Sequence, residues 1–262
     1  MTGRVLLTAL VVATAGSVQA GAFHFFEGFD GAFSNAWSPD ALAFPEEEQS
    51  PSSPGTVISY LGAPNSIIQT FGGQQVLRMT DALAPKTRRG LVTDPVLSGT
   101  EGVVEARFNT VTQNSLIIDG LFDLWLINST DSTKYVHVSP FGSQYSAFRV
   151  LTFASSIDGY NYTPYSYRNS TWYRLRITSS GDRLDVGLWS DSGTELVGHT
   201  FSHGLSALGT DFRIGIAQWM GTPDGTYTTD CAVDYVQATP EPSSVAALLI
   251  GLPFVLRLRR RK

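Results

Sequence analysis

Cysteine is almost absent from this sequence: its 262 residues contain one, Cys231, so no disulfide can form within the chain. This residue lies in an apolar, alternating run near the end of the sequence, which predicts a small buried side chain. A catalytic thiol needs surroundings that favour the thiolate, and no histidine stands near Cys231 in the sequence. A disulfide framework and thiol catalysis are therefore both excluded.

Catalytic motifs are missing as well. The chain has no Gly-x-Ser-x-Gly turn, no phosphate-binding loop and no dinucleotide-binding fingerprint. Its four histidines are scattered, and only His199 and His203 are close together, in a segment that predicts a strand ending in a turn. A zinc site there would need further ligands that the neighbouring sequence lacks. No catalytic residue is predicted.

Helical periodicity is also lacking, and alternation with a period of two takes its place. The predicted strands cover residues 75–80, 102–110, 121–127, 134–139, 147–154, 171–178, 183–188, 197–201, 211–218 and 231–239. So many strands without a helical layer must pack as two sheets or close into a barrel. We therefore predict an all-β, two-sheet antiparallel jelly-roll sandwich in one domain. Trp125, Trp172 and Trp189 lie in strand patterns, which predicts that they belong to its core.

The first twenty residues have the three-part layout of a secretory signal peptide. Arg4 precedes the apolar run 5–15, and the small residues Val18 and Ala20 stand where a signal peptidase would cleave. The apolar run is too short to span a bilayer. We expect a signal helix that is removed after Ala20, with Ala22 as the next candidate, and an exported mature protein.

The last residues repeat these parts in reverse order: Pro240-Glu241-Pro242, the apolar run 245–256 and a basic cluster. The cluster consists of Arg257, Arg259, Arg260, Arg261 and Lys262. A dozen apolar residues form a helix of about 18 Å, which is short for a hydrocarbon layer of about 30 Å. The basic residues would stay on the cytoplasmic side and leave the domain outside.

This three-part tail resembles the PEP-CTERM sorting signal, found on exported proteins of Gram-negative and related bacteria that make exopolysaccharide. The resemblance implies that an exosortase cuts near Pro240-Glu241-Pro242, after a transient stage in which the precursor is anchored in the inner membrane. We therefore expect a signal peptide at 1–20, a β-sandwich domain at 21–239, a sorting tail with a short hydrophobic helix at 240–262, and a final location at the cell surface or outside the cell.

Positive charge is scarce in the predicted mature domain. The whole chain has 18 basic and 23 acidic residues, a net charge of −5. Six of the basic residues and one acidic residue lie in the two removable ends, so the domain between them carries about −10. Such a surface repels phosphate backbones, which excludes nucleic acid as an expected partner and leaves neutral polysaccharide or divalent cations.

A second resemblance rests on the order of several short segments, 26–30 with Trp37, 102–108, 172–177 and 232–236. Together they resemble the concanavalin A-like, laminin-G-like jelly rolls of bacterial surface proteins. The resemblance implies a structural calcium ion where the first and last strands meet, with Glu27 and Asp234 at the matching positions. Carboxylate oxygens suit such a hard cation. Alternatively, both are ordinary polar residues at strand ends.

Glycoside hydrolases of that fold carry Glu-x-Asp-x-x-Glu on one strand, because alternate residues share a face and bring the carboxylates to one bond. This motif is absent. The nearest pairs are Glu101 with Glu105 and Asp119 with Asp123, each spaced to share a strand face. Solvated carboxylates at strand edges explain them without catalysis.

The most suggestive stretch for ligand binding is 158–168, which contains four tyrosines. Their rings could stack on sugar faces while hydroxyl, amide and carboxylate groups bind sugar hydroxyls. The predicted ligand-binding residues are Asp158, Tyr160, Asn161, Tyr162, Tyr165 and Tyr167. The alternative is a tyrosine-rich sheet edge that packs against its own sandwich.

Three functions remain open. The first is an exported surface or matrix protein whose domain binds carbohydrate of the cell's own exopolysaccharide. The second is a glycan-active hydrolase or lyase of the same fold with an unrecognised active site. The third is a structural or adhesive surface protein without a small ligand.

Overall fold

The computed structural model describes residues 25–31, 33–34, 36–38, 56–59, 68–82, 87–112, 119–141, 147–153, 159–220 and 228–239. The predicted signal peptide and sorting tail lie outside these residues. The described chain is built from strands, and its single helical element is one 3-10 turn at Leu205–Ala207. In this part of the chain, no helix has the length and apolar composition needed to cross a membrane.

Sheet A has eight strands in the order β15-β14-β13-β8-β17-β5-β4, with β1 also paired to β17. Their bounds are β15 Glu195–Phe201, β14 Arg183–Ser190, β13 Thr171–Ser180, β8 Gly102–Thr112, β17 Thr228–Thr239, β5 Gln74–Ala82, β4 Ile68–Phe71 and β1 Phe25–Glu27. All pairs in this sheet are antiparallel. The last strand, β17, therefore lies in the middle of the sheet, between β8 on one side and β5 and β1 on the other.

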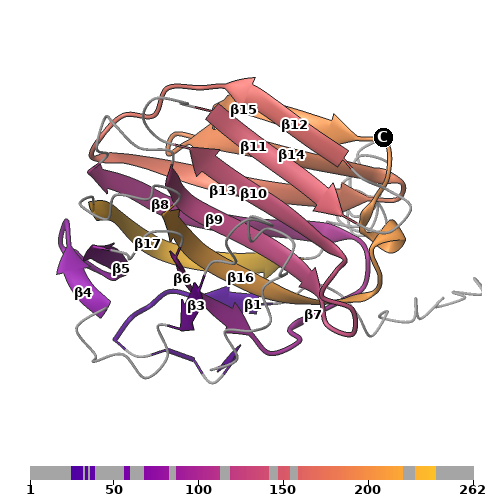
Figure 1. Ribbon diagram of the computed structural model, residues 1–262, viewed down its shortest axis with the longest axis horizontal. Coiled ribbons are helices and arrows are strands. Elements are labelled where there is room, and N and C mark those ends of the chain that lie inside the picture. Colours follow the sequence, from indigo (N-terminus) through magenta and orange to yellow (C-terminus); the bar gives the residue numbers. More distant parts are fainter. Residues whose placement is uncertain are drawn as a thin grey trace, which may run out of the picture.

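Sheet B has nine strands in the order β12-β11-β10-β9-β16-β6-β2, with β7 paired to β16 and β3 paired in parallel to β6. Their bounds are β12 Gly159–Pro164, β11 Ala147–Phe153, β10 Tyr135–Phe141, β9 Asp119–Asn128, β16 Asp211–Met220, β6 Thr87–Thr93, β2 Trp37–Ser38, β7 Leu97–Ser98 and β3 Thr56–Ser59. The two sheets lie one over the other, and β12 and β15 run together along one edge of the sandwich (Figure 1).

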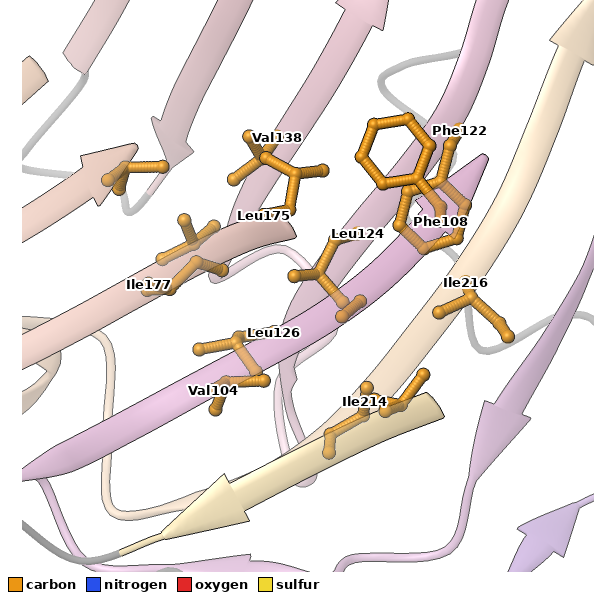
Figure 2. Packing of buried hydrophobic residues seen from close by; sticks show 14 of the residues in the cluster. Val104, Phe108, Phe122, Leu124, Leu126, Val138, Leu175, Ile177, Ile214 and Ile216 are labelled. Carbon is orange, nitrogen blue, oxygen red and sulfur yellow. The ribbon is translucent and has the colours of Figure 1, made fainter. Parts of the chain in front are cut away.

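The core fills the space between the sheets, because alternate residues of each inner strand point into it. Leu175 and Ile177 of sheet A lie close to Leu124 and Val138 of sheet B (Figure 2). The rings of Phe108 and Phe122 stack across the interface, with centroids 4.8 Å apart. This burial of large apolar side chains from both sheets is the main source of stability.

All ten predicted strands are present, and the all-β, two-sheet architecture is confirmed. A tight turn follows β9, in which Asn128 Oδ1 accepts hydrogen bonds from the backbone of Thr130 and Asp131. Cys231 is buried as predicted, and burial raises the pKa of its thiol. Seven strands were not predicted: β1, β2, β3, β4, β6, β7 and β12.

The prediction for the tryptophans is correct for one and wrong for two. Trp125 is fully buried, but in a small second cluster on the outer side of sheet B. Trp172 and Trp189 are half-buried on the outer face of sheet A, where Arg107 and Arg176 lie against their rings. Their neighbours in β13 and β14 point into the core instead.

Candidate functional site

The outer face of sheet B is set by the alternation along β9. Phe122, Leu124 and Leu126 point into the core, so Asp123 and Trp125 point outward. Strand pairing extends these two positions into two rows across the sheet. The first row holds Gly90, Ala217, Asp123, Ser139, Arg149 and Tyr162, and the second holds Val92, Gly215, Trp125 and His137.

The middle of this face holds a buried polar cluster. Asp123 is 1% exposed and His137 is fully buried. Ser139 Oγ donates to Asp123 Oδ1 at 2.5 Å, and His137 Nε2 lies 3.4 Å from the same oxygen. The imidazole stacks on the indole of Trp125, with centroids 3.6 Å apart and planes 9° apart. The carboxylate is thus the common centre for a hydroxyl and an imidazole.

This cluster does not have the order of a serine nucleophile site. In such a site the histidine stands between the serine and the carboxylate and accepts the serine's proton. Here Asp123 stands between Ser139 and His137, so the hydroxyl proton is already directed at a carboxylate. The arrangement stabilises a buried carboxylate rather than activating the hydroxyl.

The same row becomes exposed toward the edge of sheet B. Ser139 pairs with Arg149 of β11, and Arg149 pairs with Tyr162 of β12. Arg149 is half-buried, and Tyr162 is 42% exposed, one of three large apolar side chains that are exposed within the described residues. The β11–β12 edge therefore presents an accessible ring beside a guanidinium group.

The predicted ligand-binding stretch is divided between the two sides of sheet B. Strand pairing places Tyr162 on the outer face, whereas the side chain of Tyr160 lies outside the described part of the chain. Asn161 points to the other side and donates to Thr163 Oγ1 at 3.0 Å. Asp158 lies outside the described residues. The predicted residues therefore do not form one continuous surface.

The other two tyrosines of this stretch pack against the core. The Tyr167 side chain is buried, its hydroxyl donates to the carbonyl of Ala147 at 3.1 Å, and its ring meets those of Tyr165 and Tyr173 edge to face. Burial raises the pKa of Tyr165 to about 12 and that of Tyr167 well above its ordinary value. These two rings pack as the alternative reading expects, so Tyr162 is the one tyrosine of the stretch with a described, exposed side chain.

The outer face of sheet A carries a group of arginine–carboxylate ion pairs in which arginines lie over aromatic rings. These pairs are called the lattice below. Arg107 binds Asp191 through two nitrogens, at 2.7 and 3.0 Å, and Asp234 through the third at 2.6 Å. Hydrogen bonding to Arg107 lowers the pKa of Asp191. The same guanidinium lies 4.2 Å from the ring centroid of Trp172. Arg78 repeats the pattern with Asp230 and Phe71.

Glu105 is the most buried carboxylate of this lattice. It is 3% exposed and accepts hydrogen bonds from Arg176, from the Tyr235 hydroxyl at 2.6 Å and from Gln237 at 3.2 Å. Its predicted neighbour Glu101 instead accepts from the backbone of Gly181 at 3.2 Å. The two carboxylates are thus engaged separately and do not face a common site.

The carboxylates predicted to bind calcium also have separate partners. Glu27 accepts hydrogen bonds from the backbone of Phe29 and Ser34 and from Trp37 Nε1, at 2.8 to 3.0 Å. Asp234 is held by Arg107. Within the described chain no three His, Cys, Asp or Glu side chains gather as a possible metal site. Both groups are committed to protein donors, so this donor set does not favour calcium, and a calcium site remains a prediction.

Sequence reasoning missed Arg149 and the association of Asp123 with His137. Asp123 was considered only together with Asp119, four residues earlier in β9, and His137 only as one of four scattered histidines. Their contact follows from the register of β9 against β10, which pairs Trp125 with His137. The alternation of both strands was visible in the sequence, but their register was not.

The strand order of the two antiparallel sheets is that of an all-β jelly-roll sandwich. No family model matches the chain, and no curated protein matches it. Similar solved structures do exist. The CBM2 module of the evolved Dit of Lactobacillus casei BL23 phage J-1 has a TM-score of 0.59 at 14% identity, covering 83% of this chain and 95% of its own.

Two glucanase-type structures are similar as well. A prokaryotic β-1,3-1,4-glucanase (lichenase) from a mouse hindgut metagenome has a TM-score of 0.55 at 13% identity, covering 83% of this chain and 99% of its own. A Bacteroides ovatus mixed-linkage glucan GH16 protein, in complex with the product G4G4G3G, has a TM-score of 0.56 at 11% identity, covering 82% and 99%. At such identities the likeness shows the fold.

Proposed function

We propose that this protein is exported to the cell surface or extracellular matrix and binds polysaccharide, without cleaving it, at the β11–β12 edge of sheet B. The observation that carries the proposal is the exposed ring of Tyr162 beside Arg149 on the outer face. The similar solved structures include glucanases and a carbohydrate-binding module, which supports a carbohydrate ligand for this fold.

The chemistry of this edge suits a sugar ring. A flat aromatic side chain stacks on the C–H face of a pyranose, and its hydroxyl and a neighbouring guanidinium donate to sugar hydroxyls. Tyr162 and Arg149 supply these groups, because strand pairing places them opposite each other on the outer face.

Cleavage is not proposed, because hydrolysis of a glycosidic bond needs two carboxyl groups about 5 to 9.5 Å apart. Asp119 and Asp123 share a side of β9 but are four residues apart, about 13 Å along a strand. Leu121 and Leu126 stand where Glu-x-Asp-x-x-Glu, if centred on Asp123, would require its two glutamates. A binding role therefore fits this strand better than the hydrolase alternative.

The export and sorting parts of the proposal rest on the sequence of the two ends. The apolar run before Ala20 and the tail from Pro240 to Lys262 support processing by signal peptidase and exosortase. Mass spectrometry of surface material from the producing cells tests this part. We expect no peptide beyond about Pro242, and intact tails ending in Lys262 would contradict sorting.

Affinity electrophoresis of the full chain tests the binding proposal, in gels that contain mixed-linkage β-glucan, laminarin, xylan or alginate. We expect retardation by at least one polysaccharide. Tyr162→Ala should weaken binding about tenfold, because a stacking contact is worth about 0.5 to 1.5 kcal/mol beyond the buried area. Tyr162→Phe should retain most of the affinity, since it keeps the ring.

Phe26→Ala is the matched control, because Phe26 is also an exposed aromatic residue but lies on sheet A. It should leave retardation by the same polysaccharide unchanged. Absence of retardation in every gel, or retardation that Tyr162→Ala leaves intact, would contradict binding at this edge.

A further inference from the structure

The outer face of sheet A contains one carboxylate that differs from the rest. Five others on this face have partners: Glu105, Asp185, Asp191, Asp230 and Asp234 all bind arginine. Glu195, at the start of β15, is exposed and has no hydrogen bond or ion pair within the described residues. Its charge therefore contributes nothing to the lattice that holds the other groups in place.

Two glycines form the surface beneath this carboxylate. Gly187 of β14 pairs with Gly198 of β15, and Gly187 points outward because Val186 and Leu188 belong to the core. A Cβ on Gly198 would collide with Glu195 Oε1, and a Cβ on Gly187 would lie 3.5 Å from the same oxygen. The Glu195 carboxylate therefore occupies the place that a side chain at Gly198 would take, close to the place of one at Gly187.

The indole of Trp189 lies over Gly187. Its Nε1 would lie 3.0 Å from a Cβ on Gly187, so an N–H donor and the Glu195 acceptor converge on one glycine. The Arg176 guanidinium lies 4.8 Å from the centroid of the ring, and Glu105 holds that guanidinium in place. A half-buried ring beside a donor and a free acceptor is the pattern that sugar hydroxyls require.

An aromatic side chain over a strand glycine also has a structural explanation, because it covers backbone that a glycine leaves bare. That explanation accounts for Trp189 over Gly187. It does not account for Glu195, since a carboxylate over two glycines adds no apolar cover and has no partner there within the described chain. The acceptor is the feature that points to a ligand.

We propose that Trp189 and Glu195, with Gly187 and Gly198 beneath them and Arg176 against the ring, form a second polysaccharide-binding site. The ligand is a neutral glycan, because the Arg176 charge is neutralised by Glu105 while the Glu195 charge would repel uronates or sulfates. The site shares only the ligand class with the proposed function. It lies on the opposite outer face from Tyr162, so one molecule can hold two polysaccharide strands.

The test compares variants of the full chain by affinity electrophoresis in mixed-linkage β-glucan, laminarin and xylan, with alginate as the charged counterpart. Glu195→Gln should weaken binding to a neutral glycan about tenfold, because a sugar hydroxyl donates a stronger hydrogen bond to a carboxylate than to an amide oxygen. Gly198→Ala should weaken it similarly by displacing the carboxylate. Asp182→Asn, an exposed acid in the β13–β14 turn, is the matched control and should change nothing.

Trp189→Ala removes the ring and should weaken binding at least as much. If that variant unfolds, Glu195→Gln and Gly198→Ala still decide the matter, because Glu195 is exposed and a methyl group at Gly198 has only a flexible side chain to displace first. Tryptophan fluorescence gives an independent readout. The emission of the wild-type chain should shift on adding the neutral glycan, and Trp189→Phe should remove that shift.

The experiment can reject either of the two proposed binding sites independently of the other. If Tyr162→Ala abolishes binding while Glu195→Gln and Gly198→Ala leave it intact, the second site is wrong and the proposed function stands. If the sheet A variants weaken binding and Tyr162→Ala does not, the second site stands and the edge of sheet B is wrong. Absence of binding to every neutral glycan overturns the second site, and absence of binding to alginate as well overturns both.

Discussion

The outer faces of the two sheets hold their charged side chains in opposite ways. On sheet A, arginines and carboxylates pair at the surface and rest on aromatic rings, as Arg107 does with Asp191 and Trp172. On sheet B, Asp123 and His137 are buried, with Trp125 stacked on the imidazole. The first face keeps its charges in contact with water, whereas the second has removed them from it.

This difference determines how much folding stability is lost when a residue on each face is substituted. Exposed ion pairs contribute about 0 to 1 kcal/mol, because water screens them and their side chains lose freedom on pairing. Removing one partner from a buried carboxylate pair lowers the free energy of unfolding by several kcal/mol, because the remaining polar group stays buried without its partner. We therefore expect substitutions on sheet B to affect folding and those on sheet A to affect surface chemistry.

Asp123→Ala should have the largest effect on stability. It leaves the Ser139 hydroxyl and the His137 imidazole buried without their common acceptor, at an expected cost of about 3 kcal/mol in the free energy of unfolding. Urea denaturation followed by circular dichroism measures it. A loss below 1 kcal/mol would mean that the cluster is not an important part of the fold.

Glu105→Ala should have the second largest effect on stability. It tests the difference between the two faces most directly, because Glu105 is buried although it lies on sheet A. Arg176, Tyr235 and Gln237 lose their acceptor, but Arg176 can reach water. We expect a cost of about 2 kcal/mol by the same denaturation. A cost as large as that of Asp123→Ala would show that burial, and not the face, sets the penalty.

Tyr167→Phe should cost about 1 kcal/mol at neutral pH, the value of a hydrogen bond such as the one to Ala147. Burial raises the pKa of Tyr167 in the folded state, so its contribution is fully present below the unfolded value of about 10 and falls as the pH rises toward the folded value. Thermal unfolding between pH 9 and 11 should therefore decline less steeply in the variant. Identical slopes would contradict the assignment.

Asp191→Asn should have the smallest effect. The Asp191 side chain is 43% exposed, and solvent screening limits its pair with Arg107 to about 0.5 kcal/mol. Hydrogen bonding to Arg107 lowers the pKa of Asp191, so this contribution is present above the ordinary value of 3.8 and is lost as the pH falls through the folded value. Thermal unfolding at pH 7 and pH 3 should show a small difference between variant and wild type only at the higher pH.

Alternation in the sequence predicted the long strands but not which side of them is buried. In β13, Trp172, Arg174 and Arg176 alternate with Tyr173, Leu175 and Ile177, and both sets contain bulky side chains. The second set fills the core, and the tryptophan rests beneath an arginine from β8. Ion pairing with neighbouring strands decides this, and neighbours in the sheet are distant in the sequence.

Strand β6 was missed for a related reason. Its sequence, Thr-Arg-Arg-Gly-Leu-Val-Thr, has adjacent charges and a glycine that interrupt the period of two. Its place between β16 and the short strands β2 and β3 supplies the pairing that its own sequence does not indicate. The candidate site also depends on strand pairing that the sequence does not indicate. Arg149 lies beside Tyr162 only because β11 pairs with both β10 and β12.

The pairing of β1 with the end of β17 has a mechanical consequence. Phe25 lies opposite Ala238 and Glu27 opposite Val236, so the sandwich is entered and left at neighbouring points. A force applied between these two points would break the hydrogen-bonded residue pairs of β1 and β17 one after another, instead of shearing all of them at once. A domain pulled by both ends would release β1 first, while the nine residue pairs between β17 and β8 continue to hold the last strand in place.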